Sequence, residues 1–264
     1  AAGLIGQLRD SQNMTKLAKY TAELYLGLEE ETGQAIGYKI NGSLSTATHA
    51  GRMEDLARRA DMAKVFGLAV DVLGPDGCKD HYPPLNVDDV IGGIFIPSDG
   101  QADPVGITQA LAKGARMGGA QIFEHVKVEE VLVEDGNAVG VRTDTGDIVA
   151  DLVVLACGMW TRTFAAQIGV NVPLHACEHF YVLTEAHDAI TPDLPVYRDY
   201  DACAYYKEDA GKMLLGAFET VAKPWGMEGI AEDFEFGQLP DDFEHFMPIL
   251  EGAMHRMPLF EELG

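Results

Sequence analysis

The sequence predicts a mixed α/β (α+β) fold in which two domains interleave along the chain. Residues 151–158 form an apolar run bounded by a charge and a glycine, which is typical of a buried parallel strand. Helical patterns flank this run, and short strands separated by turn residues occur before and after it. A helix-flanked parallel layer in mid-chain, with antiparallel β-structure on both sides, indicates that segments of two domains alternate in the sequence.

The first hundred residues predict two helices joined to short β segments. Leu17, Leu24 and Leu28 follow a helical spacing from about residue 12 onward, and Gly33 is a suitable helix end. A β-rich segment is expected at 37–48 and a second helix at 53–66. A turn-rich connection is expected at 73–82 and a strand at 90–97.

The middle of the chain carries clearer local signals. Asp103 is a good N-cap, and Pro104 suits the first turn of a helix that ends at Gly118. We then expect a short strand at 122–123, an antiparallel meander with a β-bulge or a new strand at Val131 and Val133, and a helix at 160–168 after the apolar run. The last third predicts strands at 180–184, 202–207 and 213–220, followed by an amphipathic helix at 241–257.

The composition excludes several classes of partner. The 264 residues include 42 acidic and 19 basic side chains, which give a formal net charge of −23. Such a chain cannot neutralise phosphates, so neither nucleic acid nor an anionic membrane surface is an expected partner. No uninterrupted apolar stretch approaches the length needed to span a bilayer, so no membrane insertion is expected. The four cysteines show no C-x-x-C spacing, which favours a reducing compartment.

The end of the apolar run is a candidate cofactor contact. Ala156, Cys157 and Gly158 are small residues at the carboxyl end of the expected strand, where ligands of open α/β sheets bind. The alternative is that small residues here serve only tight strand–helix packing. The motif G-x-G-x-x-G is absent from the chain, so we expect no self-contained nucleotide-binding βαβ unit within these residues.

Two sets of polar side chains are candidates for chemistry. His175, Cys177 and His179 alternate along one expected strand, but no fourth ligand is implied, so no metal site is predicted. Cys157 lies in an apolar run that would keep it a neutral, buried thiol. His179 and Tyr205 lie in separate expected strands, and together they could orient and deprotonate a small substrate, although either residue alone is more often a structural one.

Several segments resemble one enzyme family from end to end, in order and in spacing. These segments are residues 1–4, 7–9, 28–33, 82–89, 97–104, 119–120 ahead of Val128, 156–160, 198–199 ahead of Tyr205, 216–219 and 223–225. The chain resembles the sarcosine dehydrogenase and dimethylglycine dehydrogenase family of FAD-dependent amine oxidoreductases, within the D-amino-acid oxidase-like group. The segments at 82–89 and 97–104 resemble sarcosine dehydrogenase more than dimethylglycine dehydrogenase.

The resemblance implies a fold and a division into domains. It implies a D-amino-acid oxidase-like FAD-binding domain, lacking its N-terminal βαβ unit here, interleaved with an antiparallel-sheet substrate domain. Residues 1–33 and 98–172 would belong to the FAD-binding domain, and residues 34–97 and 173–264 to the substrate-binding domain. The chain would then be an internal piece of a longer protein. We expect this piece alone to bind flavin poorly or not at all and to be inactive.

The resemblance also implies roles for individual residues. His179 and Tyr205 would be catalytic, and Arg9 would bind the substrate carboxylate. The cofactor would be contacted by Ala1, Ala2, Gly3, Leu4, Val128, Ala156, Gly158 and Trp160. A covalent histidyl link to FAD is expected immediately before residue 1, and tetrahydrofolate could bind a domain outside this chain.

The implied activity is oxidative N-demethylation of sarcosine or dimethylglycine. Hydride would pass to FAD, with release of formaldehyde or transfer of the one-carbon unit to folate. The partners would be a small N-methyl amino acid and an electron acceptor that the sequence does not identify. The alternatives are a related flavin oxidase of another amine or amino acid, or a truncated non-catalytic subunit or binding module. A bacterial cytoplasm is the expected compartment, with the mitochondrial matrix as the alternative.

Overall fold

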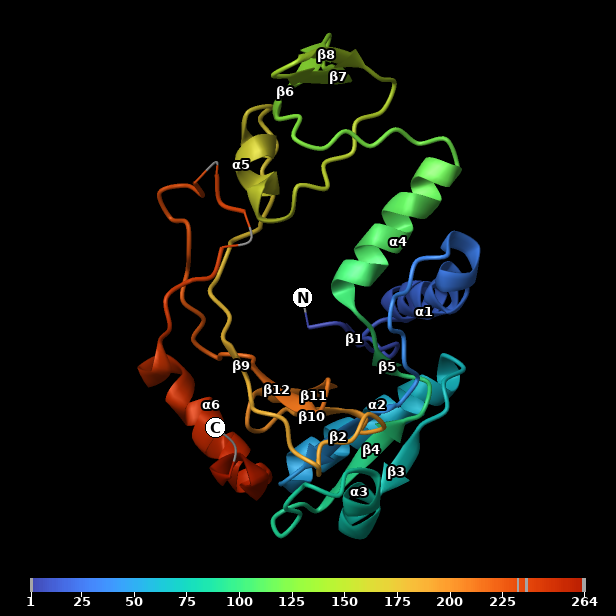
Figure 1. Cartoon of the computed structure of the whole chain (residues 1–264), viewed down its shortest axis with the longest axis vertical. Helices are drawn as coiled ribbons and strands as arrows, with labels where there is room; N and C mark the ends of the chain where they lie inside the picture. Colours follow the sequence, from blue (N-terminus) through green and yellow to red (C-terminus); the bar gives the residue numbers. More distant parts are fainter. Residues whose placement is uncertain (1, 232, 236, 263–264) are drawn as a thin grey trace. The chain divides into compact units, whose positions relative to one another are not determined.

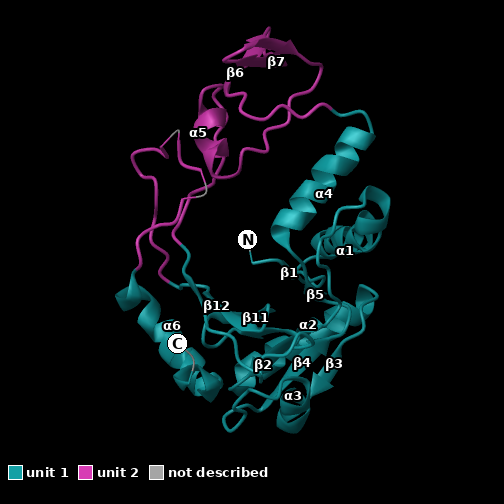
Figure 2. Cartoon of the chain, in the orientation of Figure 1, with its two compact units in different colours: residues 1–120, 179–220, 242–264 teal, residues 121–178, 221–241 magenta. Residues whose placement is uncertain are grey.

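The computed structural model describes residues 2–231, 233–235 and 237–262, and the chain forms two compact units (Figures 1 and 2). Unit 1 consists of residues 1–120, 179–220 and 242–264, and unit 2 of residues 121–178 and 221–241. The predicted interleaving of segments is therefore visible in the contacts. These units do not coincide with the predicted domain segments, whose assignment to cofactor and substrate stays a prediction.

A seven-stranded sheet forms the centre of unit 1, in the order β3-β4-β2-β10-β11-β12-β9. Its strands are β2 (Ser43–Ala47), β3 (Asp71–Leu73), β4 (Gly92–Ile96), β9 (Tyr181–Leu183), β10 (Val196–Asp199), β11 (Ala204–Asp209) and β12 (Lys212–Ala217). All neighbouring strands are antiparallel except β2 and β10. The one parallel pair thus joins two distant segments, and the expectation of a parallel layer in mid-chain is wrong.

Unit 1 also contains helices with strong local end signals. They are α1 (Gln12–Thr32), α2 (Ala50–Val65), α3 (Pro75–His81), α4 (Pro104–Met117) and α6 (Phe243–Arg256). Asp103 caps α4 by accepting hydrogen bonds from the Val105 and Gly106 N–H groups, and Gly33 ends α1 with a left-handed φ of 65°. The connection expected at 73–82 instead contains α3, because Pro75 occupies the first helical position, where its missing N–H costs nothing.

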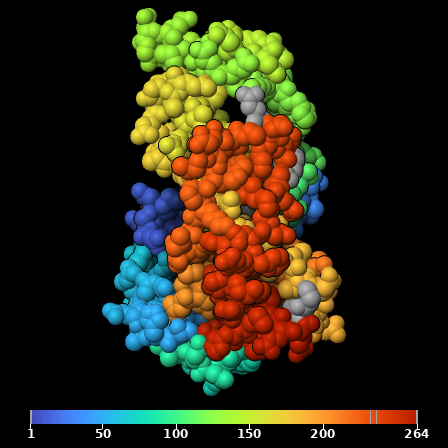
Figure 3. All heavy atoms as spheres, turned by 90° about the vertical axis from the view of Figure 1, so that its left-hand side faces the viewer, coloured from blue at the N-terminus to red at the C-terminus, as the bar shows by residue number. Residues whose placement is uncertain are grey.

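One hydrophobic cluster of unit 1 lies on one face of the sheet, and Ala47, Leu56, Ala60 and Ile94 form a separate cluster. Leu44, Tyr197, Tyr206 and Leu215 are fully buried in the first of these clusters, which also includes Phe246 of α6. Figure 3 shows α6, in red, lying across this part of the unit. Because side chains alternate along a strand, the residues next to Tyr197 and Tyr206 in sequence point to the opposite face.

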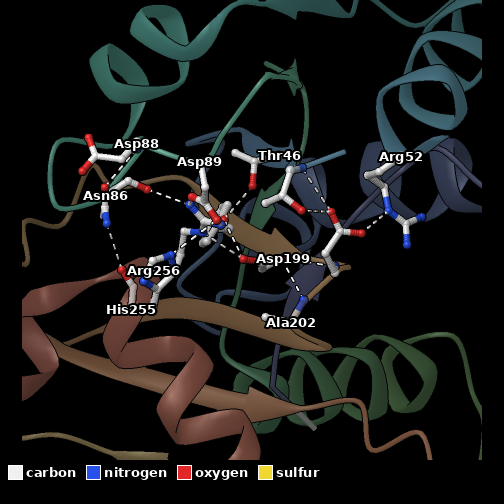
Figure 4. A network of polar contacts seen from close by, with 12 residues as sticks. Thr46, Arg52, Asn86, Asp88, Asp89, Asp199, Ala202, His255 and Arg256 are labelled. Atoms are coloured by element: carbon white, nitrogen blue, oxygen red, sulfur yellow. Dashed lines mark hydrogen bonds and ion pairs between the residues drawn. The ribbon is translucent and has the colours of Figure 1, made fainter. Parts of the chain in front are cut away.

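A buried ion-pair network ties α6 to the sheet (Figure 4). Arg256 Nε donates to Asp199 Oδ2 at 3.0 Å, and Arg256 Nη1 donates to Asp89 Oδ1 at 2.7 Å and to the Asn86 carbonyl at 2.7 Å. The side chains of Arg256 and Asp199 are only 3% and 2% exposed. The network therefore fixes the end of β10 against α6.

A two-stranded sheet holds the N-terminal segment in unit 1. Strand β1 (Leu4–Ile5) pairs with β5 (Gly100–Gln101), and the Ala102 N–H donates to the Gly3 carbonyl at 2.9 Å. Gly3 has a φ of 76°, and a Cβ there would overlap the Ala102 carbonyl oxygen. Glycine is therefore required at position 3, where the N-terminal segment lies against the backbone of Ala102.

Unit 2 contains a three-stranded antiparallel sheet of β6 (Val128–Glu134), β7 (Asn137–Thr143) and β8 (Gly146–Val149), followed by a 3-10 turn (Gly158–Trp160) and α5 (Thr161–Ala166). Register shifts in β6 confirm the predicted bulge. The expected strands at 122–123 and 151–158 are wrong. Residues 151–157 belong to no helix or strand and pair with no strand among the described residues, and Leu152 and Val154 are exposed. Among the described residues, no helix is long and apolar enough to cross a membrane.

Candidate active site

A cavity of about 820 Å³ opens in unit 1. Strands β9, β11 and β12 supply one wall through residues that include His179, Tyr205 and Lys207, while Ala2 and the 101–104 segment supply another. The structure thus brings together the two residues that the sequence selected for catalysis. Lys207 is buried, and its ammonium group makes no hydrogen bond or ion pair with any residue that the structure describes.

A glycine on the next strand leaves the space that the Tyr205 ring occupies. It lies directly opposite Gly216 in the β11–β12 register, and a Cβ on Gly216 would overlap the tyrosine ring. The ring of Phe218 lies 5.0 Å from that of Tyr205, centroid to centroid. Burial, followed by the charge of Glu219, raises the pKa of Tyr205. At neutral pH this residue is therefore a neutral phenol that can donate one hydrogen bond and accept others.

His179 is oriented by a carboxylate. Its Nδ1 lies 2.7 Å from Glu219 Oε2, and the Phe180 N–H donates to Glu219 Oε1 at 2.9 Å. The Glu219 side chain is 3% exposed, whereas that of His179 is 62% exposed. When Glu219 is ionised, Nδ1 carries the proton of this contact and Nε2 keeps a free lone pair. The carboxylate thus fixes the orientation of the imidazole ring through Nδ1.

The comparison with known proteins identifies the family to which this site belongs. Residues 1–264 match the pattern of FAD dependent oxidoreductases over the whole chain. The chain belongs to this family. The resemblance and the D-amino-acid oxidase-like fold predicted from the sequence are both confirmed.

The relatives of this chain include proteins with different named functions. It is 40% identical over 264 residues to a 4-methylaminobutanoate oxidase (formaldehyde-forming) of Paenarthrobacter nicotinovorans, covering 100% of this chain and 32% of the relative. It is 35% identical to human mitochondrial sarcosine dehydrogenase, covering 100% of this chain and 29% of the relative. It is also 35% identical to a mouse mitochondrial pyruvate dehydrogenase phosphatase regulatory subunit, covering 99% and 30%. The chain thus spans about a third of the length of these relatives.

A solved structure shows the same fold. The L-proline dehydrogenase of P.horikoshii superimposes with a TM-score of 0.85 at 22% sequence identity, covering 99% of this chain and 67% of that one. At this identity the likeness shows the fold alone.

Residues 2–4, which are expected to contact the flavin, lie beside the cavity. Ala1 lies outside the described residues. Ala2 lines the 820 Å³ cavity, and Ala2, Gly3 and Leu4 line an adjoining hollow together with Tyr205. The segment is therefore close enough to Tyr205 for one ligand to contact both, which fits its predicted role.

The remaining expected cofactor residues lie in unit 2. Val128 begins β6, and the side chains of Val128 and Trp160 are exposed. Ala156 is exposed, and Gly158 has a left-handed φ of 53° with nothing within 4 Å of an added Cβ. Open backbone and exposed apolar groups of this kind suit a flat, partly apolar cofactor such as FAD, so the residues fit the predicted group.

Arg9 lies in a separate, smaller hollow of unit 1. It is exposed and lines a space of about 280 Å³ together with Arg198 and Phe218. Phe218 also lines the larger cavity. The predicted carboxylate-binding residue is therefore next to the candidate site, although it does not line the cavity of His179.

Sequence reasoning assigned no role to Glu219 or Arg198, although both lie in segments that carried the resemblance. Glu219 follows β12, while His179 precedes β9, and only the antiparallel pairing of these strands brings the two side chains together. The expected strand with His175, Cys177 and His179 is not formed. Of these three residues, Cys177 alone takes part in a β-bridge, with Pro224. No group of three metal-binding side chains occurs in the part of the chain that the structure describes.

Proposed function

We propose that the protein uses FAD to demethylate an N-methyl amino acid oxidatively, and that this chain supplies the amine-binding site. The observation that carries the proposal is the meeting of Tyr205 and the His179–Glu219 pair at one cavity. The names of the relatives support the substrate class, since a 4-methylaminobutanoate oxidase and a sarcosine dehydrogenase both act on N-methyl amino acids.

The residues that would contact the cofactor are Ala2, Gly3, Leu4, Val128, Ala156, Gly158 and Trp160. When bound, FAD supplies the acceptor for the hydride that leaves the N-methyl carbon. The covalent histidyl link and a tetrahydrofolate partner remain parts of the proposal, since a folate carrier would capture the one-carbon unit that otherwise leaves as formaldehyde.

His179 would remove the ammonium proton from the substrate. An N-methyl amino acid is mostly protonated at neutral pH, and only its neutral nitrogen has the lone pair that assists loss of hydride from carbon. The free Nε2 of His179 accepts this proton, and the buried carboxylate of Glu219 stabilises the resulting imidazolium. Glu219 is thus a positioning residue, which orients the imidazole of His179 through Nδ1.

Tyr205 would orient the amine. Because its phenol is neutral, it can hydrogen-bond the substrate nitrogen without adding charge to the site. The ring is held over Gly216 and against Phe218, so the hydroxyl has little freedom to move. A fixed hydrogen bond of this kind positions the methyl carbon for reaction.

The proposal is tested with protein expressed from the full reading frame and loaded with FAD. Sarcosine, dimethylglycine and 4-methylaminobutanoate are supplied with an artificial electron acceptor, and formaldehyde is measured. We expect at least one substrate to be oxidised, with one formaldehyde formed per turnover. His179→Gln should lower kcat/KM by about 100-fold, and Tyr205→Phe by up to about 10-fold. Absence of turnover with all three substrates would refute the proposed substrate class.

A second candidate is a non-catalytic subunit. It is favoured by the 35% identity to a phosphatase regulatory subunit, which shows that this sequence type also occurs in a protein named for regulation. The two candidates differ in one measurement: anaerobic addition of an amine bleaches the flavin of an oxidoreductase but leaves that of a regulatory subunit unchanged. Bleaching by another amine or amino acid, and by none of the three substrates above, would indicate a related flavin oxidase.

The compartment follows from the relatives only as part of this proposal. They include a protein from a bacterium and proteins named as mitochondrial, so a bacterial cytoplasm and a mitochondrial matrix both agree with the proposed activity.

A further inference from the structure

A buried lysine faces the cavity of His179 and Tyr205. Lys207 lies two residues after Tyr205 in β11, so the two side chains leave the same face of the sheet. Lys207 is 7% exposed, and its ammonium group has no hydrogen bond or ion pair within the described part of the chain. A buried cation of this kind has lost water without gaining a counter-ion, which is unfavourable. The cavity therefore presents an unpaired positive charge.

The carboxylates that line the cavity do not neutralise this charge. Glu208 Oε2 already accepts a hydrogen bond from Lys39 Nζ at 3.0 Å. The carboxylate of Asp103 accepts hydrogen bonds from backbone N–H groups at the start of α4. Asp209 is exposed to solvent and makes no ion pair with Lys207. A ligand that enters the cavity is thus the group left to pair with the ammonium.

An unpaired amide oxygen lies at the same cavity. Gln101 is 4% exposed and lines the cavity wall. Its Nε2 donates to the Glu208 carbonyl at 3.0 Å and to Glu208 Oε2 at 3.3 Å, so the orientation of the amide is fixed. Its Oε1 is buried and accepts no hydrogen bond from any residue that the structure describes. Because Glu208 directly follows Lys207, the chain places an unpaired acceptor next to the backbone that carries the unpaired donor.

The segment that is expected to contact the flavin adjoins these two groups. Leu4 of β1 lies directly opposite Gln101 of β5, so both side chains leave the same face of this small sheet. Ala2 lines the cavity together with Gln101 and Lys207. A flavin ring that contacts residues 2–4 would therefore enter the cavity to which Lys207 and Gln101 belong.

The polar edge of a flavin ring has the chemistry that complements this pair. Its pyrimidine edge presents the C2 carbonyl, N3–H and the C4 carbonyl in succession. An ammonium group can donate to a carbonyl, and an amide oxygen can accept from N3–H. A hydride that leaves the methyl carbon of the amine carries two electrons to the ring and leaves an iminium ion behind. The ring thereby gains one negative charge, spread over N1 and the C2 carbonyl, which a desolvated cation stabilises.

We propose that Lys207 and Gln101 bind the pyrimidine edge of the flavin. Lys207 donates to the C2 carbonyl, and Gln101 Oε1 accepts from N3–H. This inference rests on the FAD binding in the proposed function, but not on the identity of the amine. Because the ammonium pairs with the charge that reduction adds, Lys207 raises the midpoint potential of the bound flavin. Gln101 adds no charge and selects a ring that carries N3–H.

The test for Lys207 is the two-electron midpoint potential of the FAD-loaded protein expressed from the full reading frame. Lys207→Met should weaken binding of the reduced flavin relative to the oxidised flavin by about 10-fold, which lowers the potential by about 30 mV. Lys207→Gln is measured beside it, as a polar variant that also lacks the charge, and Lys207→Arg should keep most of the potential.

Lys64→Met is the control for these variants, because it removes an exposed lysine that pairs with Asp61 at the surface. Its midpoint potential should equal that of the wild type. Shifts in Lys207→Met and Lys207→Gln no larger than the shift in Lys64→Met would overturn the assignment of Lys207.

The test for Gln101 is the affinity of flavin-free protein for FAD and for N3-methyl-FAD, followed by quenching of flavin fluorescence. The wild type should bind FAD about 10-fold more tightly than the methylated ring. Gln101→Leu and Gln101→Met keep similar volume without the acceptor, and each should bind the two flavins within about 3-fold of one another. Discrimination that both variants retain in full would overturn the assignment of Gln101.

These measurements separate the inference from the proposed substrate class. A protein that oxidises none of the three amines but shows both flavin effects would refute that substrate class and support the inference. Turnover of an amine without either flavin effect would support the proposed function and overturn the inference.

Discussion

Removal of Arg256 should destabilise unit 1 by about 3 kcal/mol. The substitution Arg256→Met keeps much of the side-chain volume but deletes the ion pairs to Asp199 and Asp89 and the hydrogen bond to the Asn86 carbonyl. Asp199 is 2% exposed and would lose its buried cation, and breaking a buried pair in this way costs about 3–5 kcal/mol.

Two features place the expected cost at the lower end of that range. Asp199 keeps hydrogen bonds from the N–H groups of Asp201 and Ala202, at 3.1 and 3.0 Å, which still stabilise its charge. Asp89 is 42% exposed, so water can replace Arg256 as its partner at little cost.

The assay is urea unfolding of the wild type and the variants, followed by near-ultraviolet circular dichroism of the tyrosine band. The buried tyrosines Tyr82, Tyr197 and Tyr206 make this band a probe of the core of unit 1. The double variant Arg256→Met/Asp199→Asn should be more stable than Arg256→Met, because the amide removes the unpaired charge. A cost below about 1 kcal/mol, the ordinary effect of a point substitution, or a double variant no more stable than the single, would refute the reasoning.

Three further predictions follow from single side chains. Gly216→Ala should displace the ring of Tyr205 and lower kcat/KM by about 100-fold, whereas Gly27→Ala, at an uncrowded glycine, should leave steady-state kinetics unchanged. Asp99→Asn should raise stability at neutral pH, because the raised pKa of Asp99 makes its charged form unfavourable in the folded state. In thermal melts this gain in stability should vanish as the pH falls towards 4, since the pKa of an aspartate in the unfolded chain is about 3.9. Burial opposes ionisation of Asp89, but hydrogen bonds from α6 outweigh this effect and lower the pKa of Asp89. The contribution of Asp89 to the free energy of unfolding is therefore present above about pH 4 and should be lost on acidification through the folded pKa. An acid-unfolding curve that Asp89→Asn leaves unchanged would contradict this.

The organisation of the candidate site explains why sequence reasoning reached only part of it. His179 and Tyr205 were recognisable by residue type and by their places in expected strands, and the structure puts both at one cavity. Glu219 lies beside His179 and Arg198 opposite Tyr205 only through strand pairing, and no local pattern specifies which residue of a strand faces which residue of the next.

Errors in the predicted strands have the same origin. Residues 151–158 have the composition of a buried strand, but a strand exists only when a neighbour supplies its hydrogen bonds, and none of the described residues does so. Strand β10 shows the opposite case, a strand without a clear sequence signal. Its short sequence does not predict a strand, yet it pairs with β2 on one side and β11 on the other and is central to the sheet.

The sequence by itself determined the features that depend on neighbours along the chain. The caps of α4, the glycine that ends α1, the bulge of β6 and the start of α6 all follow from contacts within a few residues. The tertiary structure alone decided the β2–β10 pairing, the carboxylate beside His179 and the approach of Arg9 and Arg198 to Gly6. These contacts join residues that lie far apart in sequence, so they depend on strand order and register, which only the folded chain defines.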